Sequence, residues 1–70
     1  MRIEFNIFEN SNNWTSTAHQ INSDILQRNV LMKGQVSDLN VSFTYDEAEH
    51  CGKIINTYHQ VIGDFEVSFN

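Results

Sequence analysis

Cysteine, proline and glycine are all scarce in this chain of 70 residues. The single cysteine, Cys51, excludes an intramolecular disulfide and a zinc site built from paired cysteines. Proline is absent and there are only three glycines, so no stretch rich in these residues separates two domains. With 40% hydrophobic residues, the chain has enough apolar side chains for a packed core. We therefore predict one compact domain over residues 1–70.

Positive charge is scarce as well. Four cations are spread along the chain against nine acids, which gives a formal net charge of −5. Nucleic acids and anionic membranes bind clusters of cations, and scattered ones contribute little. No run approaches the roughly 18 apolar residues of a membrane span, and the N-terminus lacks the pattern of a signal peptide. We expect a cytoplasmic protein that binds neither a membrane nor, directly, a nucleic acid.

Alternation of apolar and polar side chains predicts strands at both ends of the chain. It covers residues 2–8 and residues 64–70, and a period of two is the pattern of a strand with one buried face. Between them, residues 29–45 are predicted to form two strands joined by a turn around Gly34. In the second of these strands the inward side chains are Val41, Phe43 and Tyr45.

Helical spacing predicts the first of two helices over residues 13–27. Four apolar residues recur there at intervals of three and four, which places them along one stripe. They are Trp14, Ala18, Ile21 and Ile25. The segment also holds several weak helix formers, so tertiary packing has to stabilise it.

The second helix is predicted between Asp46 and Gly63. Asp46 stands at the N-cap position, and Glu49 follows three residues later as in a capping box. Gly63 comes just after the last apolar residue as a C-terminal stop. The predicted apolar stripe consists of Ala48, Cys51, Ile54, Ile55, Tyr58, Val61 and Ile62.

The same segment combines acids, two histidines and the cysteine, which are also the residues of metal and catalytic sites. His50 and His59 are nine positions apart, about half a turn out of phase on a helix, so they do not converge on one ion. Cys51 lies in the apolar stripe and is expected to be a buried structural cysteine. We predict no catalytic residue, no metal site and no cofactor, and so a protein without enzymatic activity.

The predicted order of strand, helix, strand, strand, helix and strand is typical of a ferredoxin-like βαββαβ sandwich. This fold has a four-stranded antiparallel sheet in the spatial order 4-1-3-2, with both helices on one face. Ala18 and Gly52 are small enough to let the two helices approach closely. If the short strand before Gly34 does not form, three strands and two helices remain.

The stretch VSFTYDEAEHCGKII, residues 41–55, resembles the third strand and second helix of an RNA-recognition motif. The resemblance implies the same sandwich topology. Members of that family stack bases on aromatic side chains of the open sheet face. The matching positions in this chain hold no aromatic residue, so we expect no RNA binding. They are Asn40, Ser42, Glu4 and Asn6.

Apolar side chains left over after the core is filled predict an interaction surface. They are Phe8, Leu31 and Val36. Leu31 is expected on an edge strand, which can pair with another strand. The polar side of the predicted sheet adds Glu4 and Glu66 from neighbouring strands. Our first hypothesis is therefore a non-enzymatic protein–protein interaction module, in one version a homodimer.

Two alternatives stay open. The acidity and small size fit an inhibitor from a phage or mobile element that acts as a decoy on a basic surface of a host nucleic-acid enzyme. The other alternative is a small-ligand sensor. Its site would lie between subunits, because a monomer of 70 residues has little room for a ligand pocket.

Overall fold

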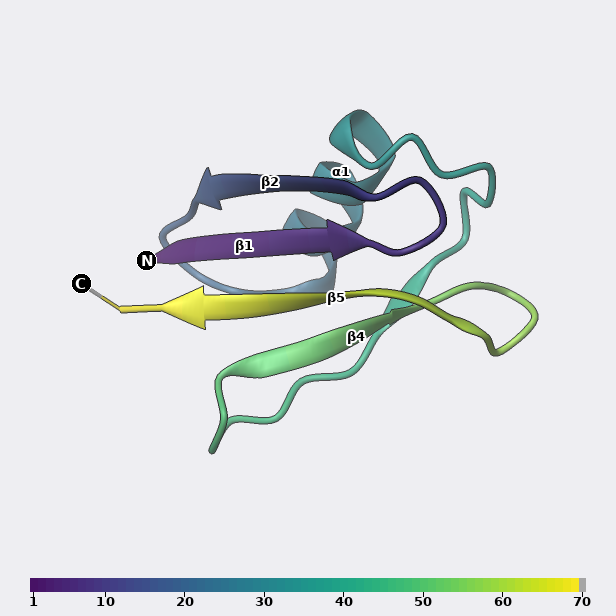
Figure 1. Ribbon diagram of the computed structural model, residues 1–70. Coiled ribbons are helices and arrows are strands. Elements are labelled where there is room, and N and C mark those ends of the chain that lie inside the picture. Colours follow the sequence, from purple (N-terminus) through teal and green to yellow (C-terminus); the bar gives the residue numbers. More distant parts are fainter. Residues whose placement is uncertain (70) are drawn as a thin grey trace.

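The computed structural model describes residues 1–69 as one antiparallel sheet with a helix against one of its faces (Figure 1). The sheet has five strands in the order β2-β1-β5-β4-β3, so the first and last strands of the chain lie side by side. The elements are β1 (Arg2–Ile7), β2 (Asn12–Thr17), α1 (Ser23–Lys33), β3 (Ser42–Phe43), β4 (Cys51–Ile55) and β5 (Val61–Ser68).

The strands predicted at the two ends of the chain are confirmed. β1 ends one residue before the predicted Phe8, and β5 begins three residues before the predicted residue 64. The last residue of that prediction, Asn70, lies outside the described residues. The two strands pair antiparallel, with Phe5 opposite Phe65 and both side chains buried.

The predicted ferredoxin-like sandwich is wrong, and so is the alternative with three strands and two helices. The sheet has five strands, and the described residues contain a single α-helix. Residues 13–27 form most of β2 and the start of α1 instead of one helix. Their apolar spacing matches a helix, but Trp14, Thr15 and Thr17 are aromatic and β-branched residues that favour strands.

Helix α1 takes the place of the short strand predicted before Gly34. The Asn22 side chain caps it by accepting a hydrogen bond from the Ile25 N–H at 2.9 Å. Leu26 and Val30 are its buried residues. The leucine, methionine and lysine at its C-terminal end are good helix formers, so this stretch extends the helix instead of forming a strand.

The second predicted helix is absent, because residues 46–63 form a turn, β4, a second turn and the start of β5. The Asp46 carboxylate does cap two N–H groups, those of Ala48 and Glu49 at 2.9 and 3.3 Å. The chain then reverses, and Asp46 and Cys51 exchange backbone hydrogen bonds. A turn and a helix N-cap use the same bonds to an aspartate, so the sequence does not separate them. The stretch that resembles an RNA-recognition motif therefore lacks the expected helix.

The strand predicted over the second half of residues 29–45 is reduced to β3. Of its expected inward side chains, Val41 is buried and Phe43 is half-buried. Tyr45 is 38% exposed and stacks on Phe65 with ring centroids 6.1 Å apart. This segment thus closes the edge of the core without forming a long strand.

The core lies between α1 and one face of the sheet, which we call the covered face. Aromatic rings cross this face in a row: Phe5 stacks on Trp14 with centroids 4.9 Å apart and lies 6.3 Å from Phe65. Burying a large aromatic side chain contributes about 3 kcal/mol, so these rings dominate the stability of a small domain. The buried apolar residues are Ile3, Phe5, Ile7, Leu26, Val30, Val41, Ile54, Phe65 and Val67.

Gly52 and Gly63 lie within strands, at points where a side chain would not fit. A Cβ atom on Gly52 would overlap the Thr44 carbonyl oxygen and lie 2.5 Å from the Phe65 ring. A Cβ atom on Gly63 would overlap the Asn6 carbonyl oxygen. Gly52 therefore makes room for the core of the sheet, not for a second helix, and Gly63 is not a helix stop.

Within residues 1–69, four residues other than glycine have a positive φ, the left-handed backbone conformation that glycine adopts most easily. Ser11, Gln35, His50 and His59 have φ angles between 53° and 61°, and no glycine has a positive φ. Three of them lie in hairpin loops, and Gln35 follows α1. The turns therefore carry a weak sequence signal, because glycine is missing where turn geometry favours it.

Asp38 ties the segment after α1 to the hairpin between β4 and β5. Its carboxylate accepts hydrogen bonds from the Thr57 hydroxyl at 2.5 Å, the Thr57 N–H at 2.8 Å and the Asn40 N–H at 2.9 Å. These bonds, with those from Thr57 foremost, lower the pKa of Asp38 below its ordinary value of 3.8. The ionised carboxylate therefore helps to hold this part of the fold.

Candidate functional site

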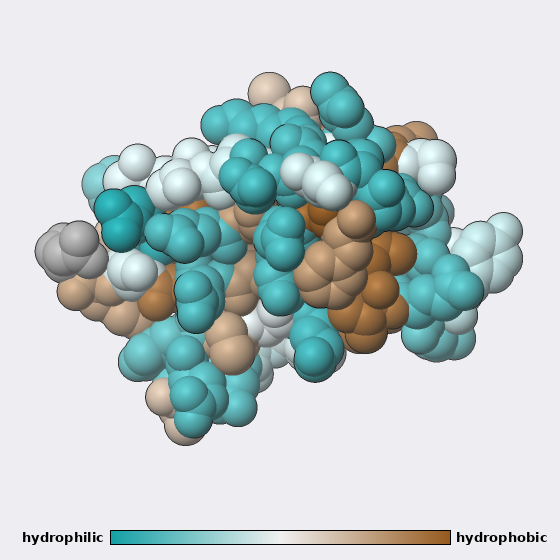
Figure 2. All heavy atoms as spheres, viewed as in Figure 1, coloured by the Kyte–Doolittle hydropathy of each residue, from teal (hydrophilic) through white to brown (hydrophobic). Residues whose placement is uncertain are grey.

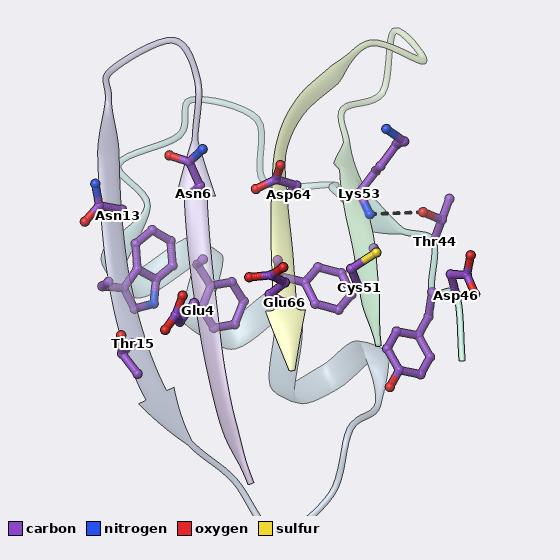
Figure 3. A pocket seen from close by; sticks show the side chains of 15 residues that line it. Glu4, Asn6, Asn13, Thr15, Thr44, Asp46, Cys51, Lys53, Asp64 and Glu66 are labelled. Carbon is purple, nitrogen blue, oxygen red and sulfur yellow. Dashed lines mark hydrogen bonds between the residues drawn. The ribbon is translucent and has the colours of Figure 1, made fainter. Parts of the chain in front are cut away.

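The face of the sheet opposite α1 is polar, and we call it the open face (Figure 3). Strand alternation sends the even-numbered side chains of β1 and β5 to this face, together with the odd-numbered ones of β2 and β4. A groove of about 850 Å³ lies over it. The charged side chains that line the groove are Glu4, Asp46, Lys53, Asp64 and Glu66.

Glu4 and Glu66 lie directly opposite each other at the centre of the open face. Even-numbered residues of β1 exchange hydrogen bonds with β5, as the 2.9 Å bond from the Phe8 N–H to the Ile62 carbonyl shows at the end of this ladder. The Cα atoms of such a pair are about 5.5 Å apart, so the two carboxylates repel each other. Arg2 offsets part of this repulsion, with its guanidinium 3.8 Å from the Glu4 carboxylate.

Asp64 and Asp46 add two further carboxylates to the groove. Asp64 is the cross-strand partner of Lys53 on β4. Among the described residues, Lys53 is the one cation that lines the groove, against the carboxylates of Glu4, Asp46, Asp64 and Glu66. The groove therefore has a negative potential that attracts cationic groups.

Cys51 lies half-buried on the open face, which corrects its predicted place in the buried stripe of a helix. The alternation of β4 turns Gly52 and Ile54 to the covered face instead. His50 and His59 lie in the loops at opposite ends of β4. In the part of the chain that the structure describes, no three His, Cys, Asp or Glu residues gather in a way that could hold a metal ion.

The open face also has an apolar end. Phe8 is 49% exposed there, at the end of β1. Ile62 is half-buried beside Phe8, whose N–H donates to the Ile62 carbonyl at 2.9 Å, and it also packs against the core. Ile55 is half-buried on β4 opposite Val61, where the register of β4 and β5 shifts. Figure 2 shows a hydrophobic patch on this face, toward the hairpin that joins β4 and β5. Acidic and apolar side chains thus lie next to each other on one surface.

Three of the five predicted interaction residues, Phe8, Glu4 and Glu66, share the open face. The other two do not belong to it. Leu31 lies on α1 with 39% of its surface exposed, and Val36 is half-buried against the core. The prediction that Leu31 lies on an edge strand is wrong, because its segment continues α1.

Sequence reasoning missed Lys53 and β2 as parts of this surface. A helix predicted over residues 46–63 hides the alternation of Cys51 and Lys53 with buried neighbours, which is the pattern of a strand. Similarly, a helix predicted from residue 13 hides β2, although its threonines and tryptophan favour a strand. β2 is one edge of the sheet, and β3 is the other.

Comparison of the chain with models of protein families, with curated proteins and with solved structures gives no match. Within residues 1–69, the structure has no helix that is long and apolar enough to span a membrane. A functional proposal for this chain therefore rests on the geometry and charge of the open face.

Proposed function

We propose that this protein is a non-enzymatic protein–protein interaction module whose open face binds a basic surface of another protein. The observation that carries the proposal is the pair of opposed carboxylates, Glu4 and Glu66, at the centre of a groove. Like charges held directly opposite each other destabilise a sheet, by a few tenths to about 1 kcal/mol. A partner that places a lysine or arginine between them removes this repulsion on binding.

The apolar end of the open face supplies the second component of such an interface. Protein interfaces combine an apolar centre, often aromatic, with a polar rim. Phe8 is a large exposed aromatic residue next to Ile62, and the acids lie on the same side of β1 and β5. The expected partner therefore presents an apolar side chain next to a cluster of cations. Complementary charge would mainly raise the association rate and make it sensitive to salt.

A second candidate function is a narrower form of the first. The four carboxylates that line one groove support a decoy that occupies the nucleic-acid channel of a host enzyme, as expected of a phage or mobile-element inhibitor. A competition experiment distinguishes the two functions. Double-stranded DNA should displace the protein from its partner only if the partner's basic surface is a nucleic-acid site.

The test is a titration of the ¹⁵N-labelled protein with a peptide of alternating lysine and leucine, followed by NMR. We expect shifts in the amides of Glu4, Glu66 and Phe8 and a steep loss of affinity between 50 and 300 mM salt, on the order of tenfold. The variant E4Q/E66Q should lose most of the binding.

The matched control for this test is E47Q/E49Q. It removes the same two charges from exposed residues in the turn before β4. If both double variants lose affinity equally, binding follows net charge alone and the open face is not the site. Shifts confined to α1 would equally contradict the proposal.

A further inference from the structure

Strand β2 is an edge of the sheet without the features that normally protect an edge from pairing. Its six residues, Asn12–Thr17, contain no charged residue and no proline. Its pairing with β1 runs without a register shift from Asn12 to Thr17, so no bulge twists the edge away. An uncharged, regular edge strand of this length is a template for another strand.

The register shows which backbone groups of β2 are free. Met1 and Ala18 exchange two hydrogen bonds, the Met1 amino group to the Ala18 carbonyl and the Ala18 N–H to the Met1 carbonyl, both at 3.1 Å. In an antiparallel pair such exchanges alternate along the strand. The N–H and carbonyl groups of Asn13, Thr15 and Thr17 therefore point away from β1. Among the described residues, no strand pairs with that side of β2.

We propose that a second copy of this chain pairs with β2, antiparallel, around a two-fold axis at Thr15. In this register Thr15 lies opposite Thr15 of the other copy, and Asn13 lies opposite Thr17 on both sides. These three pairs exchange six backbone hydrogen bonds, two for each pair. The two sheets then join into one, and their open faces become continuous.

The register is self-complementary, which favours a second copy as the occupant of this edge, and the charge distribution does not oppose it. Each chain carries a formal net charge of −5, so two copies associate only where their acids stay apart. Glu4 lies one strand inward, as the partner of Thr15. The two Glu4 residues would be three strand spacings apart, about 14 Å, which exceeds the screening length of about 8 Å at physiological salt. The opposed Thr and Asn side chains are uncharged and can hydrogen-bond with each other.

The covered side of β2 is also suited to this pairing. The register places Trp14 opposite Ser16 of the second copy, and neither residue carries a charge. The indole N–H of Trp14 is buried and has no acceptor within residues 1–69. A hydroxyl brought to the position opposite Trp14 is a suitable acceptor, and a buried N–H gains from an acceptor.

Disulfide cross-linking tests the register directly. In a C51S background, T15C should form a disulfide-linked dimer on mild oxidation, because the opposed Cα atoms would be about 5.5 Å apart, within the range of a disulfide. N13C and T17C are the matched controls. Each same-residue pair would be about 14 Å apart, so neither variant should cross-link alone. A mixture of N13C and T17C chains should cross-link, but only into mixed dimers.

Light scattering after size-exclusion chromatography tests the association without new cysteines. We expect the unmodified chain to shift from monomer to dimer as its concentration rises, T15K to lose the dimer, and T15V to keep it. A chain that stays monomeric at the highest concentration, a dimer unaffected by T15K, or T17C that cross-links alone as fast as T15C would each overturn the proposal. Thr15 is the cross-strand partner of Glu4 on the open face, so these variants are used for the dimer alone. The peptide titration is done on the unmodified chain and on E4Q/E66Q, so either proposal can fail without the other.

Discussion

The covered and open faces of the sheet are made by the same strands, yet their side chains have opposite effects on the fold. On the covered face, Phe5 and Phe65 lie opposite each other and are buried. One residue away in each strand, Glu4 and Glu66 also lie opposite each other, but on the open face. The first pair stabilises the sheet by burial, whereas the second destabilises it by repulsion. Adjacent residues of the same strands thus carry different roles: one pair stabilises the fold, and the other is proposed to bind a partner.

The largest expected effect comes from Phe65→Ala, compared with Glu66→Ala next to it. Phe65→Ala removes a ring from the centre of the core and should lower the free energy of unfolding by about 3–5 kcal/mol. A domain of this size is stable by roughly 4–10 kcal/mol, so the variant should be partly unfolded. Glu66→Ala should change the free energy by no more than about 1 kcal/mol. Urea denaturation measures both, and a similar loss in the two variants would contradict the separation of the faces.

Gly52→Ala should have the next largest effect, although it adds a single carbon. The new Cβ atom would overlap the Thr44 carbonyl oxygen and lie 2.5 Å from the Phe65 ring. Overpacking of this kind costs about 1–3 kcal/mol, and more where backbone has to move. The control is His59→Gly, at a φ of 61°, which should stabilise the protein by up to about 1 kcal/mol. Thermal melting of the two variants should therefore shift in opposite directions.

A smaller effect of opposite sign is expected from Glu66→Gln on the open face. It removes the repulsion between the opposed carboxylates and should stabilise the sheet by about 0.2–1 kcal/mol at low salt. The gain should shrink as salt screens the charges. Glu4→Gln is the control, because it also removes the ion pair with Arg2 and should stabilise less. A Glu66→Gln variant that is less stable than the unmodified chain would show that the carboxylate has a structural partner.

The smallest effect should come from Asp38, which belongs to neither face. Its pKa is lowered in the folded state, so its contribution is present above the ordinary value of 3.8 and is lost as pH falls through the folded pKa. Asp38→Asn should therefore lower the stability slightly near neutral pH and change it little well below pH 3.8, so that the variant loses less stability on acidification than the unmodified chain. Denaturation curves at several pH values measure this. An unchanged acid dependence would mean that the bonds to Thr57 do not persist in solution.

Half of the sheet could be predicted from the sequence, and the other half could not. β1 and β5 each have one buried face. No glycine interrupts the alternation of apolar and polar side chains in β1, or in β5 after Gly63, so the period of two is clear. In β4 the covered positions are Gly52 and Ile54, and a glycine contributes no apolar side chain to the pattern. The remaining apolar residues then match a helical spacing. Position 52 has to be glycine because the Phe65 ring packs against it. This contact joins residues of two different strands, so local sequence patterns do not contain it.

The turns misled the prediction for a related reason. Asp46 forms the hydrogen bonds of a helix N-cap, but in a hairpin loop that ends with His50 in the left-handed region. A glycine in place of His50 would have indicated a hairpin. Without it, the cap signal favours a helix.

The shared face of Glu4 and Glu66 could be predicted, because it follows from the alternation of two neighbouring end strands. Their direct opposition also depends on the register of β1 and β5, which the structure supplies. The β2 edge could not be predicted, because the helical spacing of Trp14 and Ala18 outweighed the strand preference of the threonines between them. The prediction that places Leu31 on an edge strand is wrong for a related reason, because a segment that forms a helix is predicted as a strand. The hypothesis of an edge strand stays, but it applies to a different segment.

The order of the strands also determines when this domain can fold. β1 pairs with β5, so Arg2 meets Ser68, 66 positions later in the chain, at the centre of the sheet. Closing so long a loop is slow, because its entropy is lost before the contact forms. During synthesis, the hairpin of β1 and β2 emerges long before β5 and has an unpaired central strand until then. The chain is therefore most exposed to aggregation, and to binding by chaperones, before residues 61–68 leave the ribosome.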